Sequence, residues 1–217
     1  MTMSATTETL ILPDSPTPKD GSLMGIGSGR LFGLWDVAMI DPPWPKRKGG
    51  KRAVRPNQGR ALDYPTMSVE EIFALLDTEV FCHGADTHTV FLWGVDEYLH
   101  AGEAQMEQRG YRRHARLIWD KCNGVAPAFS VRYAHEYLAW YYKPNFMPVS
   151  VESRGKLTTV IREAAREHSR KPESAYAAIA AWYPSARKAD IFSREPREGW
   201  MQYGNQTQHF SASCPNI

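Results

Sequence analysis

Short, largely apolar runs alternate with helical patterns along most of this chain, and this alternation limits the fold more than any other feature. The run Trp35–Ile40 carries one charged residue and is stopped by Pro42, which is typical of a strand buried on both faces of a parallel sheet. Similar runs predict further strands at Thr89–Trp93, Leu117–Trp119, Glu136–Tyr142 and Ala189–Phe192. The expected fold class is therefore α/β, with three layers and a mostly parallel central sheet.

Three helices are predicted between these strands. Ser68 and Glu71 form a capping box ahead of an apolar run, so a helix begins there. A second helix is expected over Glu97–Gln108, because Gly110 follows it as a stop signal. Pro172 suits the first position of a third helix, which Pro184 ends.

Composition indicates one domain with a sizeable core, because the chain has 217 residues of which 42% are hydrophobic. We expect an N-terminal arm over 1–30, the domain over 31–210 and a tail over 211–217. No apolar run approaches the roughly 18 residues of a membrane span, so a cytoplasmic location without membrane contact is expected. Three scattered cysteines fit neither a disulfide framework nor a thiolate zinc site, so no metal is expected.

The segment 45–62 is basic and contains no carboxylate, although the net charge of the whole chain is only +2. Such a loop can bind the phosphates of a nucleic acid. The alternative is a solvated insertion without a ligand. The residues expected to contact phosphates are Lys46, Arg47, Lys48, Lys51 and Arg52.

The sequence DPPW follows the first predicted strand, where ligands collect in parallel sheets. A carboxylate at Asp41 accepts hydrogen bonds and donates none, and the two prolines fix the direction of the Pro42 carbonyl. These two acceptors fit an amine with two hydrogens, such as the exocyclic amine of a nucleobase, and Trp44 could stack on the base. A rigid turn with a surface acid is the alternative.

Eight motifs in order resemble the MT-A70 family of adenine-N6 methyltransferases, which includes the catalytic subunit of the eukaryotic messenger-RNA methyltransferase and many bacterial and phage proteins. The resemblance runs from Trp35 to Gln206. It implies a Rossmann-like methyltransferase fold with a circularly permuted motif order, in which DPPW precedes the cosubstrate motifs. It also implies S-adenosylmethionine as cosubstrate, without a metal. The motifs are DPPW, YPTMSVEEI, FLW, WDKCN, HEYLAWYYK, HSRKP, RKADIFSR and GNQ.

By this resemblance, Asp41, Pro42, Pro43 and Trp44 are the catalytic motif, and Asp41 also lies near the cosubstrate. Lys171 resembles the lysine that meets the cosubstrate carboxylate. The ribose side is assigned to Asp190, Arg194, Asn205 and Gln206, and the target side to Tyr64, Lys121, Asn123 and Glu136. The eukaryotic enzyme has a His-Asn pair that is absent here, so one edge of the ribose site is either open or filled by Arg197.

The expected reaction is transfer of methyl from S-adenosylmethionine to N6 of adenine in nucleic acid, with DNA favoured over RNA because the basic loop resembles those of bacterial and phage members. The target adenine must be flipped out or presented in a single strand. The alternatives are an RNA methyltransferase, a catalytically silent nucleic-acid-binding subunit, and a methyltransferase for cytosine N4 or a glutamine amide. A monomer or homodimer is expected, or assembly with a related partner subunit.

Overall fold

The computed structural model of the protein describes residues 33–45, 65–123, 131, 133–167 and 169–210. Within them the chain forms one seven-stranded sheet in the order β5-β3-β4-β2-β1-β6-β7. The strands are β1 (Trp35–Ile40), β2 (Gly84–Gly94), β3 (Arg112–Asp120), β4 (His135–Lys143), β5 (Val160–Arg162), β6 (Lys188–Ile191) and β7 (Trp200–Tyr203). The helices are α1 (Val69–Glu79), α2 (Leu99–Gln108) and α3 (Glu173–Trp182). The predicted arm, the basic loop after Pro45 and the tail lie outside the described residues, so the predicted domain bounds remain predictions.

The sheet is mostly parallel. Strand β1 pairs in parallel with both β2 and β6, and β7 extends the parallel run on one side. Strand β4 is antiparallel to both of its neighbours, β2 and β3, and β5 is parallel to β3. The other six strands of the described chain therefore point the same way, which confirms the predicted α/β fold class.

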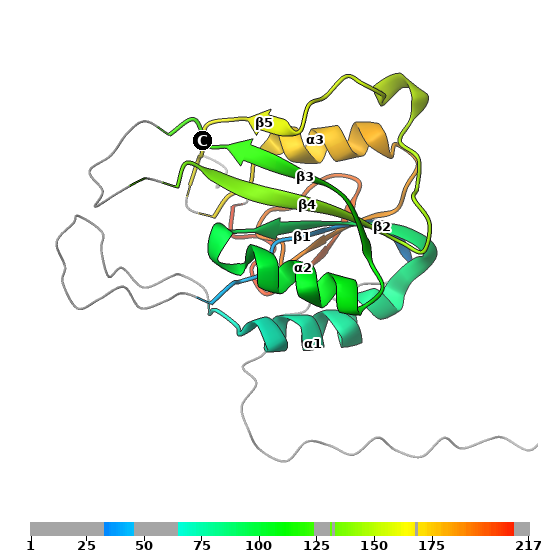
Figure 1. Ribbon diagram of the computed structural model, residues 1–217, viewed down its shortest axis with the longest axis horizontal. Helices are drawn as coiled ribbons and strands as arrows, with labels where there is room; N and C mark the ends of the chain where they lie inside the picture. The colour runs from blue at the N-terminus through cyan, green and yellow to red at the C-terminus, as the bar shows by residue number, and fades with distance from the viewer. Residues whose placement is uncertain (1–32, 46–64, 124–130, 132, 168, 211–217) are drawn as a thin grey trace, which may run out of the picture.

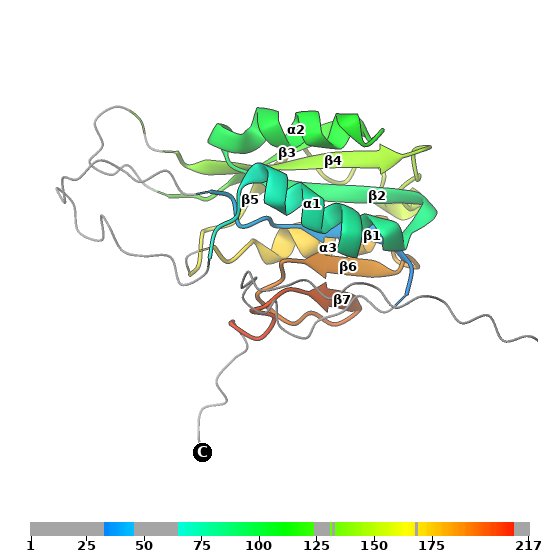
Figure 2. The same ribbon diagram turned by 90° about the horizontal axis from the view of Figure 1, so that it is seen from below.

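Helices cover both faces of the sheet, giving three layers (Figures 1 and 2). Helices α1 and α2 pack on one face, where Ile72, Leu76 and Met106 meet sheet residues such as Ala38 and Tyr141. Helix α3 packs on the other face through a separate cluster. Its apolar residues Ala175, Tyr176, Ile179 and Trp182 lie against Val37, Met39, Phe91 and Trp140. Because β1 sits between these layers, its side chains are almost completely buried, as the apolar run predicts.

The capping box of α1 is confirmed. The Glu71 N–H donates to the Ser68 hydroxyl at 3.1 Å, and the Ser68 N–H donates to the Glu71 carboxylate at 2.7 Å. The start of α2 differs from the prediction, because residues Asp96–Tyr98 form a 3-10 turn before the α-helix begins at Leu99. Strands β5 and β7 were not predicted. They are three and four residues long, which is too short for an alternating pattern to show.

Helix α3 begins one residue later than predicted, with Pro172 at its N-cap. Proline has no side-chain acceptor, so another group must satisfy the first N–H groups of the helix. Glu163 does so, accepting the N–H of Glu173 at 3.0 Å and that of Ser174 at 2.8 Å. The anion that this helix start favours is therefore a side chain of the protein itself.

Candidate active site at the carboxyl ends of the parallel strands

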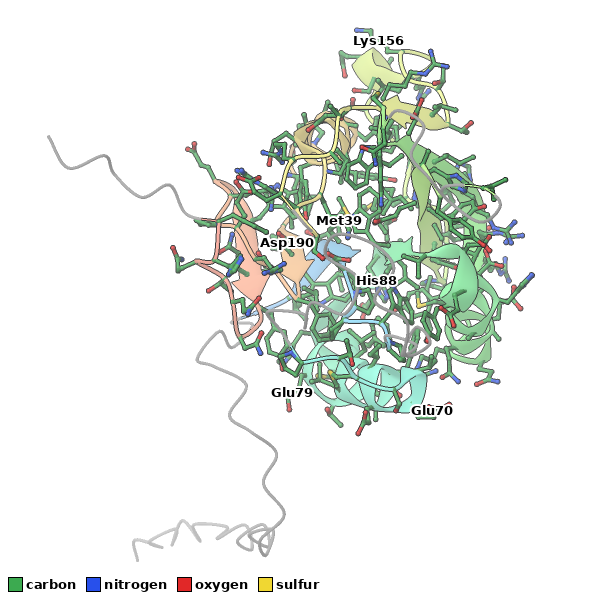
Figure 3. All side chains as sticks on the ribbon, turned by 90° about the vertical axis from the view of Figure 1, so that its left-hand side faces the viewer. Met39, Glu70, Glu79, His88, Lys156 and Asp190 are labelled. Atoms are coloured by element: carbon green, nitrogen blue, oxygen red, sulfur yellow. The ribbon has the colours of Figure 1, made fainter. Side chains whose placement is uncertain are left out.

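Asp41 lies at the centre of the sheet edge where the parallel strands end. Its backbone N–H donates to the Ile191 carbonyl at 3.1 Å, so the pairing of β1 with β6 continues to this residue. Strand β4 runs in the opposite direction, so its first residues, including Glu136, reach the same edge. Figure 3 looks onto this edge, with Met39 of β1 beside Asp190 of β6, its partner in the sheet. Functional side chains from distant parts of the sequence therefore meet here.

The DPPW turn is fixed by its own hydrogen bonds. The Trp44 N–H donates to the Pro42 carbonyl at 2.8 Å, and the Trp44 indole N–H donates to the Trp93 carbonyl at 3.0 Å. The indole ring also lies parallel to the Tyr98 ring, with centroids 5.8 Å apart. A carbonyl oxygen has two lone pairs, so Pro42 retains one acceptor position. The stacking of Trp44 on a target base stays a prediction.

A chain of four charged side chains crosses the site. The Lys171 ammonium lies 2.9 Å from Oδ1 of Asp41 and 3.2 Å from Oε2 of Glu136. The other carboxylate oxygen of Glu136, Oε1, accepts from Lys121 at 2.6 Å. The site residues predicted from DPPW, HSRKP, HEYLAWYYK and WDKCN are thus brought into direct contact. Lys171 also lies over the Trp93 ring, 5.5 Å from its centroid, so one side of this ammonium faces an aromatic surface.

Burial sets the protonation of this chain. Burial raises the pKa of Asp41, although the Lys171 ammonium opposes this effect. Burial alone would also raise the pKa of Glu136. The ammonium groups of Lys171 and Lys121 have a larger, opposite effect, so the net pKa of Glu136 lies below its ordinary value. Burial lowers the pKa of Lys171, and the carboxylates of Asp41 and Glu136 raise it by more, so this lysine stays charged. Of the two carboxylates in this chain of charges, Asp41 is therefore the one whose pKa is raised.

A cleft lies beside Asp41, between the start of α3 and the loop that joins β6 to β7; its empty volume, counted together with the solvent at its open mouth, is about 260 Å³. Asp190 lies at its base and is 1% exposed. It accepts hydrogen bonds from the Tyr176 hydroxyl at 3.2 Å, the Ser193 hydroxyl at 3.0 Å and Arg197 at 3.1 Å. Burial raises the pKa of Asp190 to about 7 despite these donors.

The cation that contacts Asp190 among the described residues is Arg197, and the assignment of this edge to a ribose stays a prediction. Arg197 also pairs with Glu173 and Glu195, both at 2.9 Å. Arg194, assigned to the ribose side, lines the same cleft with its guanidinium 4.7 Å from the Phe210 ring centroid.

Three other predicted residues, Asn205, Gln206 and Asn123, follow strands β7 and β3. Gly204 lies directly against the backbone of Ser193, and after it Asn205 is exposed and Gln206 half-buried. Asn123 is half-buried just beyond β3. Their assignments stay predictions. Tyr64 and the five basic residues Lys46, Arg47, Lys48, Lys51 and Arg52 lie outside the described residues.

The cleft residues that were not predicted as site residues from the sequence are Ser169, Arg170, Tyr176, Phe192, Ser193, Glu195 and Phe210. Tyr176 has the spacing of a core residue on the apolar face of α3, so nothing in the pattern marks it as a hydrogen-bond donor to Asp190. Ser193 and Glu195 flank Arg194 in the β6–β7 loop, and their proximity to a predicted site residue was the available signal.

Comparison with known proteins decides the family. The MT-A70 family model matches residues 35–206. The chain belongs to the MT-A70 family. An Arabidopsis thaliana protein named N(6)-adenosine-methyltransferase MT-A70-like is 27% identical over 205 residues, covering 86% of this chain and 27% of that protein. A Drosophila melanogaster N(6)-adenosine-methyltransferase MT-A70-like protein is 28% identical, with 86% and 29% covered. The human N(6)-adenosine-methyltransferase catalytic subunit METTL3 is 24% identical, with 86% and 30% covered. This MT-A70 chain thus spans less than a third of the length of these relatives.

The side chains around the cleft fit the chemistry of S-adenosylmethionine, whose groups are an amino acid, a ribose and an adenine. Lys171 offers a cation for a carboxylate, Asp190 and Glu195 offer acceptors for hydroxyl groups, and Phe192 and Phe210 offer aromatic surfaces. Among the described residues no group of three His, Cys, Asp or Glu side chains is arranged to hold a metal ion. Nor does any described helix have the length and apolar character to cross a membrane.

Proposed function

We propose that this MT-A70 protein transfers a methyl group from S-adenosylmethionine to N6 of adenine in nucleic acid, with DNA as the first substrate. The observation that carries the proposal is the placement of Asp41. Its carboxylate lies at the edge where ligands of parallel sheets bind, beside the cleft, with one oxygen held by Lys171 at 2.9 Å.

The residues of DPPW supply position and proton acceptors. Oδ2 of Asp41 and the second lone pair of the Pro42 carbonyl accept the two hydrogens of the amine, which leaves the nitrogen lone pair free to face the methyl donor in the cleft beside Asp41. Bound S-adenosylmethionine would supply an electrophilic methyl group, and its sulfur would keep the electron pair of the broken S–CH3 bond and leave as neutral S-adenosylhomocysteine. When the amine gains a methyl group it must lose a proton, and Asp41 takes it, because burial raises the pKa of this carboxyl. Alignment of two bound reactants can supply about 7–11 kcal/mol of the barrier.

The preference for DNA rests on the basic segment after Pro45, which resembles that of bacterial and phage members. RNA is the second candidate, favoured by the names of the relatives, which describe adenosine methyltransferases. In either case the base is flipped out or single-stranded, because N6 is otherwise paired and stacked. The cytoplasmic location and the assembly as a monomer, a homodimer or a complex with a related subunit remain predictions.

The deciding experiment measures methyl transfer from radiolabelled S-adenosylmethionine to matched single- and double-stranded DNA and RNA, followed by nucleoside analysis. N6-methyladenine should form, and should disappear in Asp41→Ala. The matched control is Asp36→Ala, because Asp36 lies on the same strand, pairs with Arg187 and is remote from the cleft lining. Label in another nucleoside, or none in any nucleic acid, contradicts the proposal. Label in RNA alone overturns only the DNA assignment.

The basic segment has a separate test. Replacing Lys46, Arg47, Lys48, Lys51 and Arg52 together by Ser should flatten the dependence of log affinity on log salt. Each lost phosphate contact changes the slope by about 0.9 on duplex DNA and about 0.7 on a single strand. An unchanged slope means that the segment does not contact phosphates.

A further inference from the structure

The loop between β6 and β7 contributes a third carboxylate to the cleft, Glu195, beside Asp41 and Asp190. Its side chain is 14% exposed and lines the same cleft as Asp41 and Asp190. Two arginines hold it. Arg170 donates to both carboxylate oxygens, through Nη2 to Oε1 and through Nε to Oε2 at 3.0 Å. Arg197 donates to Oε2 at 2.9 Å. Glu195 is therefore fixed in place at the wall of the cleft.

The hydrogen bonds to the carboxylates of Glu195 and Asp190 leave the same number of acceptor positions open on each. An ionised carboxylate has about four acceptor positions. Those of Glu195 are taken by the two donors of Arg170 and the one of Arg197. Asp190 is ionised above about pH 7, because burial raises its pKa to about 7, and in this form its acceptor positions are taken by Tyr176 on Oδ1 and by Ser193 and Arg197 on Oδ2. Each carboxylate thus retains one acceptor position.

Arg197 has no donor to spare. It directs Nη1 to Asp190 and the Glu195 carbonyl, Nη2 to Glu173 and Glu195, and Nε to Glu173. Its guanidinium also lies 3.6 Å from the centroid of the Tyr176 ring. Because its N–H groups are all engaged within the protein, Arg197 fixes its neighbours and does not bind a ligand itself.

We propose that Glu195 is a further cosubstrate-binding residue, which accepts one hydroxyl of the cosubstrate's ribose while Asp190 accepts the other, with Arg197 as the positioning residue for both. Two fixed acceptors in one cleft fit a vicinal diol, which donates two hydrogen bonds and carries no charge. An anionic ligand does not fit them, because both acceptors are carboxylates. The inference rests on the proposed function, since it assigns the ribose of that function's cosubstrate to these residues.

The test combines changes in the protein with changes in the ligand. Isothermal titration calorimetry measures the binding of S-adenosylhomocysteine and of its 2′-deoxy and 3′-deoxy forms to the full chain. A hydrogen bond to a charged acceptor is worth roughly 10- to 100-fold in affinity, so in the unmodified protein each missing hydroxyl should weaken binding by about that factor. In Glu195→Ala, one of the two deoxy forms should bind less than about 3-fold more weakly than S-adenosylhomocysteine itself, because the protein no longer has the acceptor for the hydroxyl that this form lacks.

The matched control is Glu167→Ala. Glu167 also pairs with Arg170, at 3.0 Å, but its side chain is 59% exposed and does not line the cleft. This variant should keep the full cost of both missing hydroxyls. Glu195→Gln keeps the size of the side chain and serves if Glu195→Ala does not fold; it should reduce the same hydroxyl cost in part. In Arg197→Ala, the loss of affinity caused by each missing hydroxyl should be smaller than in the unmodified protein. In Arg197→Lys, part of this difference should return.

The outcomes separate the two proposals. If S-adenosylhomocysteine binds the unmodified protein but each missing hydroxyl costs the same in the Glu195 variants, the assignment of Glu195 is overturned and the proposed function stands. If S-adenosylhomocysteine does not bind the unmodified protein, the proposed function fails and this inference fails with it. If Glu167→Ala also binds a deoxy form as tightly as S-adenosylhomocysteine, the effect of the Glu195 variants is an indirect one through Arg170. This result also overturns the assignment.

Discussion

Replacing Glu136 with Gln removes one charge from the buried chain while keeping the shape of the side chain. Glu136 is 14% exposed and pairs with Lys171, which is 9% exposed, and with Lys121, which is 20% exposed. Breaking a fully buried pair costs about 3–5 kcal/mol, because an uncompensated charge remains. Lys171 keeps Asp41 as a partner and Lys121 is partly solvated, so the lower end of this range applies. The variant should lose about 3 kcal/mol of unfolding free energy, or roughly 6–12 °C in Tm.

Urea unfolding at several pH values measures this loss. The net pKa of Glu136 lies below its ordinary value because of the two lysines, although burial acts in the opposite direction. A lowered pKa gives stability that is present above the unfolded pKa and is lost as pH falls through the folded pKa. The difference between the two proteins should therefore be full at pH 7 and shrink below about pH 4.

The control for this prediction is Asp77→Asn, which breaks a surface pair with Arg109 in which Asp77 is 46% exposed. Exposed pairs contribute about 0–1 kcal/mol. The reasoning is refuted if Glu136→Gln lowers the free energy of unfolding by no more than this control does, or if the loss does not depend on pH.

The substitution Glu136→Gln has a second consequence. It removes a like charge that raises the pKa of Asp41, so the acid limb of methyl transfer should move to lower pH.

Three further substitutions test other parts of the structure. Gly204→Ala should destabilise the protein by about 1–3 kcal/mol in thermal unfolding, because the added Cβ would lie 3.1 Å from both the N and O atoms of Ser193 in a backbone conformation with φ of +155°; wild-type stability would contradict this. Trp35→Phe should cost about 1–3 kcal/mol, because the buried Val80 carbonyl loses its 2.9 Å bond from the indole; a cost under 0.5 kcal/mol would show that another donor replaces it. Burial raises the pKa of Asp190 to about 7, so the stability gained by its protonation is full below about pH 4 and is lost as pH rises to 7. Asp190→Asn should therefore gain stability relative to the unmodified protein over this range, by up to about 4 kcal/mol, and a difference independent of pH in urea unfolding would refute the assignment.

The sequence predicted the central strands because burial on two faces leaves a clear apolar composition. Trp35–Ile40 agrees with the structure at both ends. The strand predicted at Leu117–Trp119 extends in fact over Arg112–Asp120, and its first residues are exposed and polar, which conceals a strand from any apolar pattern. The direction of β4 is likewise not encoded in its own residues. It follows from the antiparallel pairing with its neighbours.

For the site, the motifs identified Asp41, Lys171, Glu136 and Lys121 as separate positions, and their contacts emerged only from the fold. The resemblance placed Asp190 and Arg194 on the same side of the site, and both line the cleft, but it did not indicate that Arg197 is the cation in contact with Asp190. That pairing depends on the course of the β6–β7 loop, which a comparison of aligned motifs does not specify. Tyr176 was assigned to the core by its helical spacing. Its ring does line the core, yet its hydroxyl donates to Asp190, so one residue serves both purposes.

The position of Lys171 explains why so many acids converge on this edge. A buried ammonium immediately before a helix is unfavourable, because the positive end of the helix dipole and the loss of solvation both act against it. Glu163 occupies the first N–H groups of α3, and Asp41 and Glu136 pair with the ammonium directly. These contacts keep the lysine charged, and the lysine in turn holds one oxygen of Asp41 while the other stays available. Removing Glu163 or Glu136 should therefore disturb Asp41 as well, which links the stability of this edge to the chemistry proposed for it.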